Sequence, residues 1–244
     1  MSVRAYSSIR WVCHSNARSV ASTLMRTDQL IAIVREFVDE DVDCIVDDEK
    51  TVTSARASIL WLTKGFLRRV QPEVLGELRR RQNILCADYV DDMEREELRE
   101  HIDVFVAASI KQLLHFNSTL SDKRVCLVSH HADPRAASVR CQQSRFSAGY
   151  FGELANARYR EDLSSLVDFV PVDTRAPRDN WASRLTDYSL HYAVRQPRHF
   201  DGFKPFLKGF TAAACDAAII VPLSESDAMY YLGHDYPFIL SDDT

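Results

Sequence analysis

The sequence lacks the features that mark a membrane-spanning, secreted or metal-binding protein. No apolar run in its 244 residues approaches the ~20 residues of a membrane helix, and residues 1–10 hold no apolar stretch long enough for a signal peptide. The six cysteines form no CxxC pair, and most lie in or beside apolar runs. We therefore expect buried, reduced thiols rather than disulfides or metal ligands, and a cytoplasmic protein.

Basic residues do not outnumber acidic ones in this chain. The formal net charge is -5, so nothing favours a nucleic-acid partner, and tight binding to an anionic membrane is disfavoured. The basic cluster Arg79–Arg81 could contact a phosphorylated acceptor or a membrane surface, but an exposed helix end explains it equally well. We expect no nucleic acid, and peripheral membrane or partner-protein contact stays open.

Short apolar runs alternate with longer amphipathic segments along the whole chain. This alternation predicts an α/β protein whose parallel strands are covered by helices on both faces. The predicted strands are 9–13, 43–46, 57–62, 83–87, 103–107, 124–129, 146–151, 167–172, 188–194 and 217–221. The apolar run at 57–62 could equally start a helix. The predicted helices are 19–39, 72–82, 92–101, 109–117, 154–163, 181–185, 206–215 and 227–232.

The alternation stops at HADPRAASVRCQQ, residues 131–143, and then begins again. This break predicts two successive Rossmann-like domains, 1–135 and 136–244. We expect them to face a cleft that holds the functional site.

Loops that follow the strands of a parallel sheet are candidate ligand sites. The loop at 14–19 has no glycine and no GxGxxG motif, but it offers Ser15 and Asn16 near a predicted helix N-terminus, where anions are favoured. Capping of that helix by Ser15 and Asn16 is an equally good interpretation.

Two lysines four residues apart, Lys204 and Lys208, precede a helix of small residues at 211–215. Cationic charge beside the positive end of a helix dipole suits a phosphate. Arg195, at the carboxyl end of the predicted strand 188–194, could add a third cation. The alternative is that these side chains are solvated or paired with surface carboxylates.

The pattern KPxxKxxxAAxCxAxII, followed by an acidic turn and DAxYYLGxDYP, resembles the carboxyl-terminal domain of GT-B glycosyltransferases over residues 194–238. These enzymes have two Rossmann-like domains and use nucleotide-sugar donors. The resemblance implies that Lys208 meets the donor diphosphate, assisted by Lys204. It also places Glu225 or Asp227 near ribose or sugar hydroxyls.

The same resemblance implies that Gly149 and Gly152 let backbone amides approach the donor. It requires no cofactor, and no metal if lysines and a helix end hold the diphosphate. Many retaining members carry two glutamates eight positions apart, where this sequence has Phe203 and Thr211.

Two adjacent histidines, His130 and His131, follow an apolar run just before the predicted boundary. One of them could act as general base on an acceptor hydroxyl. A polar linker explains them equally well, and metal binding by the HHxD run is a further possibility that the spacing does not secure.

The sequence therefore predicts a glycosyltransferase of the hexosyltransferase type. It would move a sugar from a nucleotide-diphosphate sugar to the hydroxyl of an acceptor that the sequence does not identify. The alternative is a non-catalytic protein of the same fold that binds a nucleotide, a sugar phosphate or a partner protein.

Overall fold

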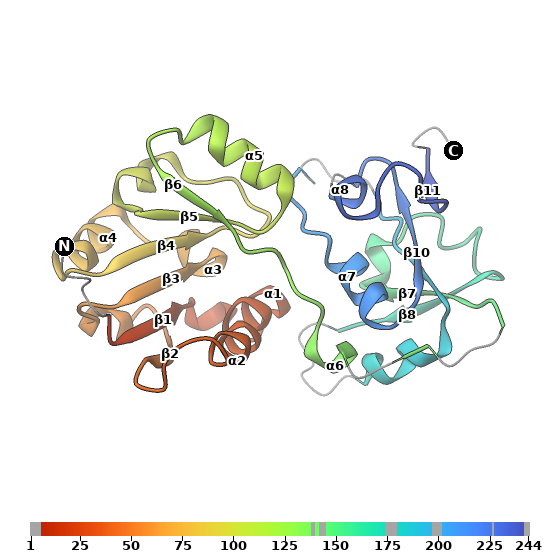
Figure 1. The fold of residues 1–244 in the computed structure, drawn as a ribbon, viewed down its shortest axis with the longest axis horizontal. Helices are drawn as coiled ribbons and strands as arrows, with labels where there is room; N and C mark the ends of the chain where they lie inside the picture. The colour runs from red at the N-terminus through yellow and green to blue at the C-terminus, as the bar shows by residue number, and fades with distance from the viewer. Residues whose placement is uncertain are drawn as a thin grey trace. The chain divides into compact units, whose positions relative to one another are not determined.

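A computed structural model describes residues 6–137, 140–141, 145–173, 180–196, 202–225 and 227–241. The chain divides into two compact units between Ser129 and His130, a few residues before the boundary predicted from the sequence. Each unit contains one sheet whose strands all run parallel (Figure 1). The predicted fold class is confirmed: this is an α/β protein with two Rossmann-like sheets.

The first sheet has the strand order β2-β1-β3-β4-β5-β6 (Figure 1). Apolar side chains alternate along the strands, so Leu60, Leu85 and Phe105 share one buried face with the helices α3, α4 and α5. The strands are β1 (Ser8–Val12), β2 (Asp43–Asp47), β3 (Ile59–Thr63), β4 (Ile84–Asp88), β5 (Val104–Ala107) and β6 (Arg124–Leu127). The α-helices are α1 (Ala21–Leu24), α2 (Leu30–Val34), α3 (Lys64–Leu67), α4 (Pro72–Arg80) and α5 (Ile110–Thr119).

The helix predicted at 19–39 is shorter and irregular. α1 and α2 are joined by a π-helical segment, η2 (Met25–Gln29), in the middle of one helical stretch. This wider turn carries Arg26, whose guanidinium lies 5.6 Å from the centre of the Trp61 ring. Arg26 Nε also donates to Asp88 Oδ2 at 2.6 Å, and both side chains are fully buried. The π segment therefore brings a cation into the interior beside the end of β4.

Three other predicted helices are 3-10 turns, and one of them, predicted at 181–185, is η6 (Trp181–Asp187). The other two are also shortened. At 92–101 only η4 (Glu96–His101) is helical, because Arg95 is extended and its guanidinium donates to the carbonyls of Leu67 and Val70. At 154–163 only η5 (Leu154–Asn156) is helical, because Ala157 turns to bridge Arg195 and Tyr159 has a φ of 55°. Contacts with distant residues overcome the local helical preference in both segments.

The second sheet has the strand order β11-β10-β9-β7-β8 (Figure 1). Its strands are β7 (Ala148–Gly152), β8 (Val167–Pro171), β9 (Leu190–Tyr192), β10 (Ala218–Pro222) and β11 (Ile239–Leu240). Helices α7 (Leu207–Ala214) and α8 (Ala228–Leu232) pack with Ile219 and Val221 on one face. Leu154 and Leu163 pack on the other, against Tyr150 and Tyr192. The remaining elements are α6 (Pro134–Ala137) and the 3-10 turns η1 (Ser15–Ala17), η3 (Thr51–Ser54) and η6 (Trp181–Asp187).

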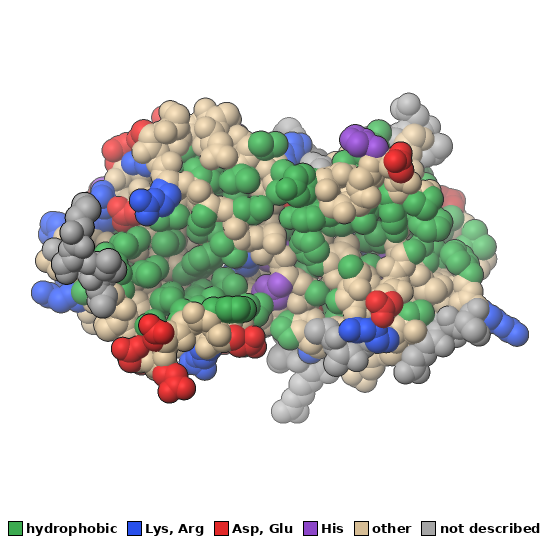
Figure 2. Space-filling model, viewed as in Figure 1, with side chains coloured by type: hydrophobic (Ala, Val, Ile, Leu, Met, Phe, Trp, Pro, Cys, Tyr) green, Lys and Arg blue, Asp and Glu red, His purple; other side chains and the backbone are tan. Residues whose placement is uncertain are grey.

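All six cysteines are free thiols, three of them buried and three half-buried. In the described part of the chain, no helix is both long and apolar enough to span a membrane. Acidic and basic side chains lie close together on the surface of the first unit (Figure 2). The basic cluster Arg79–Arg81 follows this pattern, because Arg79 pairs with Asp103, and Arg80 and Arg81 pair with Glu77.

Candidate functional site

Each sheet has a point at which the order of its strands reverses. β2 and β3 lie on opposite sides of β1, and β8 and β9 lie on opposite sides of β7. Ligands of doubly wound sheets bind beyond the carboxyl ends of the strands at such a point. The candidate ligand sites are therefore the ends of β1 and β3 in the first unit and of β7 and β9 in the second.

In the first unit, the loop after β1 already holds an anion of its own. The backbone N–H of Ser15 donates to Glu49 at 2.8 Å, and Ser15 Oγ donates to the same carboxylate at 2.6 Å. Asn16 donates its backbone N–H to His14 Nδ1 at 3.2 Å. The loop binds an anion, as its composition suggests, but that anion is the Glu49 side chain.

The bonds from Ser15 lower the pKa of Glu49 to about 2. Stabilisation by the ionised carboxylate is present above its ordinary pKa of 4.5 and is lost as the pH falls through 2. We expect an NMR titration of Glu49 to show a midpoint near 2, and Ser15→Ala to move the midpoint upward. Glu97 serves as an internal reference, because its pKa is lowered by its own backbone N–H and then by Arg95, neither of which Ser15→Ala alters. An unchanged Glu49 midpoint in Ser15→Ala would contradict the assignment.

In the second unit, the crossover helix α7 begins at the carboxyl edge of the sheet. Lys208 is its second residue, and no side chain caps its N-terminus. The Lys208 ammonium lies 3.7 Å from the centre of the Tyr150 ring on β7. Lys208 Nζ is buried and has no hydrogen-bond partner among the described residues. A lysine held in this way is poised to meet an anion.

The charges around Lys208 are mostly positive. Burial, then Arg195, lower the pKa of Lys208 to about 7; Lys204 lowers it further, whereas Glu225 raises it. Arg195 Nη2 lies 3.1 Å from Glu225 Oε2, so Glu225 already has a cationic partner. Arg195 follows β9 and Glu225 follows β10, and the structure thus brings four of the predicted residues to one edge of the sheet.

His191 on β9 belongs to the same cluster. Its Nε2 is buried without a hydrogen-bond partner in the described part of the chain, and its ring centre lies 5.3 Å from that of Phe151. Burial, then Lys208, lower the pKa of His191 to about 4, so this imidazole is neutral at neutral pH. Neither His191 nor Tyr150 stands out in the sequence, where both lie inside ordinary apolar strands.

The two predicted glycines have different surroundings. A Cβ on Gly149 would lie 2.7 Å from Tyr188 Cγ, so the Tyr188 ring requires a glycine at this position. Gly152 ends β7 with a φ of 155°, a conformation that favours glycine, and a Cβ there would lie 3.0 Å from the Tyr150 hydroxyl. Both glycines therefore have packing reasons, and a contact with a donor stays a prediction.

The other predicted residues lie on neighbouring segments. His130 is buried and His131 half-buried, both between β6 and α6. Asp227 is buried at the start of α8, after β10. Among the described residues, no three His, Cys, Asp or Glu side chains are grouped so that they could hold a metal ion, and the HHxD run forms no such group.

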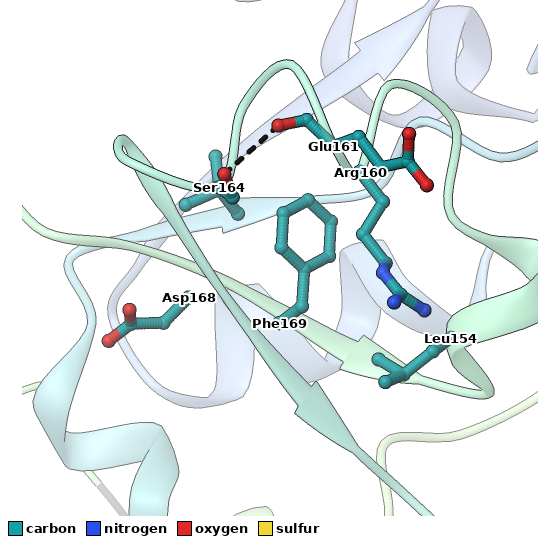
Figure 3. Close-up of a pocket in the computed structure, with 7 residues that line it drawn as sticks. Leu154, Arg160, Glu161, Ser164, Asp168 and Phe169 are labelled. Carbon is teal, nitrogen blue, oxygen red and sulfur yellow. Dashed lines mark hydrogen bonds between the residues drawn. The ribbon is translucent and has the colours of Figure 1, made fainter.

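A separate open cavity of about 470 Å³ lies beside β8 (Figure 3). Leu154 and Phe169 supply apolar surface, and Arg160 and Glu161 come from the segment that crosses from β7 to β8. Ser164 Oγ donates to the Glu161 carbonyl at 2.9 Å. The cavity includes the first residues of β8, so it lies away from the carboxyl edge that carries Lys208.

No known family model matches the chain, and no curated protein matches it. The candidate site therefore depends on the geometry of its own residues.

Proposed function

We propose that the second unit binds the diphosphate of a nucleoside diphosphate sugar and that the protein transfers the sugar to an acceptor hydroxyl. One observation carries the proposal: Lys208 Nζ is buried at the carboxyl edge of a Rossmann-like sheet without a hydrogen-bond partner among the described residues. Arg195 and Lys204 lie close enough to affect its charge. A diphosphate would supply the anionic hydrogen-bond partner that Lys208 Nζ lacks among the described residues.

The same residues would assist bond cleavage. The departing diphosphate gains negative charge as the glycosidic bond breaks, and preorganised cations stabilise that charge. Lys208 would contact the diphosphate directly, with Lys204 and Arg195 beside it. His130 or His131 would accept the proton of the acceptor hydroxyl. Glu225 or Asp227 would bind ribose or sugar hydroxyls.

Binding without turnover is the second candidate function. It is favoured by the absence of two glutamates. Many retaining glycosyltransferases carry glutamate at two positions where this chain has Phe203 and Thr211. Phe203 is buried and apolar, and Thr211 Oγ1 donates to the Leu207 carbonyl at 3.0 Å. Neither side chain can act as a carboxylate, so the site could recognise a nucleotide without reacting with it.

The first experiment is thermal unfolding with UDP, GDP, CDP, ADP and their common sugar conjugates. A ligand at 100 times its Kd adds about 2.7 kcal/mol to the free energy of unfolding, which is a measurable shift in Tm. We expect one nucleotide family to raise the Tm, and Lys208→Met to reduce the shift by about half or more. Lys50→Met, an exposed lysine in the first unit, is the matched control and should keep it.

Turnover then separates the two candidates. Release of the free nucleoside diphosphate from the stabilising sugar conjugate, measured with a panel of acceptor alcohols, supports transfer. Stabilisation without release supports binding alone. No shift with any nucleotide contradicts both candidates.

A further inference from the structure

Two buried side-chain nitrogens of the second unit, Lys208 Nζ from α7 and His191 Nε2 from β9, lack a hydrogen-bond partner among the described residues. A buried polar group without a partner costs about 1–3 kcal/mol, and a buried charge costs more. Two such groups from different elements, with Lys208 close enough to lower the pKa of His191, indicate a site built for a ligand.

The surroundings favour an uncharged amine in the empty site. Burial and the positive charges of Arg195 after β9 and Lys204 before α7 disfavour the ammonium, and they outweigh the ring face of Tyr150 on β7, which favours it. Glu225 after β10 is the nearby carboxylate, and it pairs with Arg195 at 3.1 Å. An anion that enters this cluster offsets the positive charges of Arg195 and Lys204. The charged ammonium of Lys208 is then more favourable than the neutral amine.

We propose that His191 is a second phosphate-binding residue beside Lys208, and that one proton enters the site with the phosphate group. His191 stays neutral and donates its Nε2–H to a phosphate oxygen. Lys208 takes a proton from solvent and binds the same group as an ammonium. The inference rests on the proposed nucleotide site and names both the second ligand-binding residue and the pH dependence of binding.

The sign of the pH dependence follows from linkage. The pKa of Lys208 is about 7 in the empty site, because of burial and the neighbouring cations, and a bound phosphate raises it. Binding therefore takes up a proton above pH 7, and affinity falls as the pH rises. The second pKa of a terminal phosphate is about 6, so the charge on the ligand's phosphates is constant between pH 7.5 and 9.

Isothermal titration calorimetry with UDP, GDP, CDP and ADP tests the proton. Heats measured at pH 8 in Tris and in HEPES, which differ in ionisation enthalpy, give the number of protons taken up. For a group that titrates near pH 7 we expect about 0.9 proton per ligand, and a Kd that rises about tenfold per pH unit. Binding without uptake, with a constant Kd from pH 7.5 to 9, overturns the inference but leaves the nucleotide site. No binding of any of the four overturns the proposed function as well.

Three variants separate the roles. Lys208→Arg keeps a permanent charge, so we expect binding with no proton uptake. His191→Phe should weaken binding about 10- to 100-fold, the range for a hydrogen bond to a charged group, while uptake continues. His191→Gln, which keeps an N–H donor, should recover part of that loss. Unchanged affinity in His191→Phe, with its Tm preserved, overturns the role of His191.

Discussion

Replacing Asp88 with alanine is expected to destabilise the first unit by about 3–5 kcal/mol, because it leaves a fully buried guanidinium without its carboxylate. Asp88 Oδ2 accepts from Arg26 Nε at 2.6 Å and from Trp61 Nε1 at 2.9 Å. Arg26 and Asp88 are both 0 % exposed, so water cannot replace the lost partner. Urea unfolding measures the loss.

The measurement can be confined to one unit. Trp11 and Trp61 lie in the first unit and Trp181 in the second. In a Trp181→Phe background, tryptophan fluorescence therefore follows the unfolding of the first unit alone. We expect the urea midpoint of that transition to fall in Asp88→Ala.

Two controls show whether the loss comes from an unpaired buried charge. The double variant Arg26→Met, Asp88→Leu removes both charges and should recover most of the stability, since buried pairs are often replaceable by apolar side chains. Asp92→Ala breaks the exposed pair with Arg68 and should cost less than about 1 kcal/mol. Equal losses in Asp88→Ala and the double variant would show that packing, rather than charge, is at stake.

The sheets were predictable from the sequence because their strands are short apolar runs. β3 and β4 lie almost entirely within the predicted ranges 57–62 and 83–87. Parallel strands covered on both faces need continuous apolar sequence, which remains visible without any knowledge of the fold. The division into two units was visible for the same reason, as a break in this pattern.

The irregular helices were not predictable, because residues far away in the sequence decide them. No sequence pattern near Met25–Gln29 predicts a π-helical turn. The turn is explained by the hydrogen bond from Arg26 to Asp88, which lies 62 residues later in the chain. Arg95 is held extended by carbonyls of an earlier segment, which prevents a helix from starting at Asp92. Local propensity is too weak to resist such contacts.

The candidate site was half predictable. A lysine at the start of a crossover helix has a sequence signal, because apolar runs place the helix after a strand. Tyr150 and His191 have none, since their roles come from the packing of β7 and β9 beneath Lys208. Ser15 had a signal for an anion, but its anion is Glu49, a residue on the loop after β2.

Lys208→Met should change stability and affinity in opposite directions. A methionine fills similar space without a buried polar atom, so we expect the second unit to gain about 1–3 kcal/mol in its free energy of unfolding. Affinity for the nucleotide of the proposed site should fall about 10- to 100-fold, because the proposed charge-assisted bond to phosphate would be lost. Urea unfolding followed by the fluorescence of Trp181, in a Trp11→Phe, Trp61→Phe background, measures the first effect, and calorimetry the second.

The gain in stability should also depend on pH. The pKa of Lys208 is lowered by burial from 10.5 to about 7. Between these two pH values the folded protein has lost a proton that the unfolded chain still holds. The penalty of the lysine is therefore largest below pH 7 and fades as the pH rises towards 10.5. The advantage of methionine over lysine should shrink over the same range, whereas Lys50→Met should show none. A methionine variant that is less stable at every pH would mean that the lysine is satisfied within the protein. A lysine that lowers stability in the empty site but raises affinity for a ligand would be explained by a role in binding.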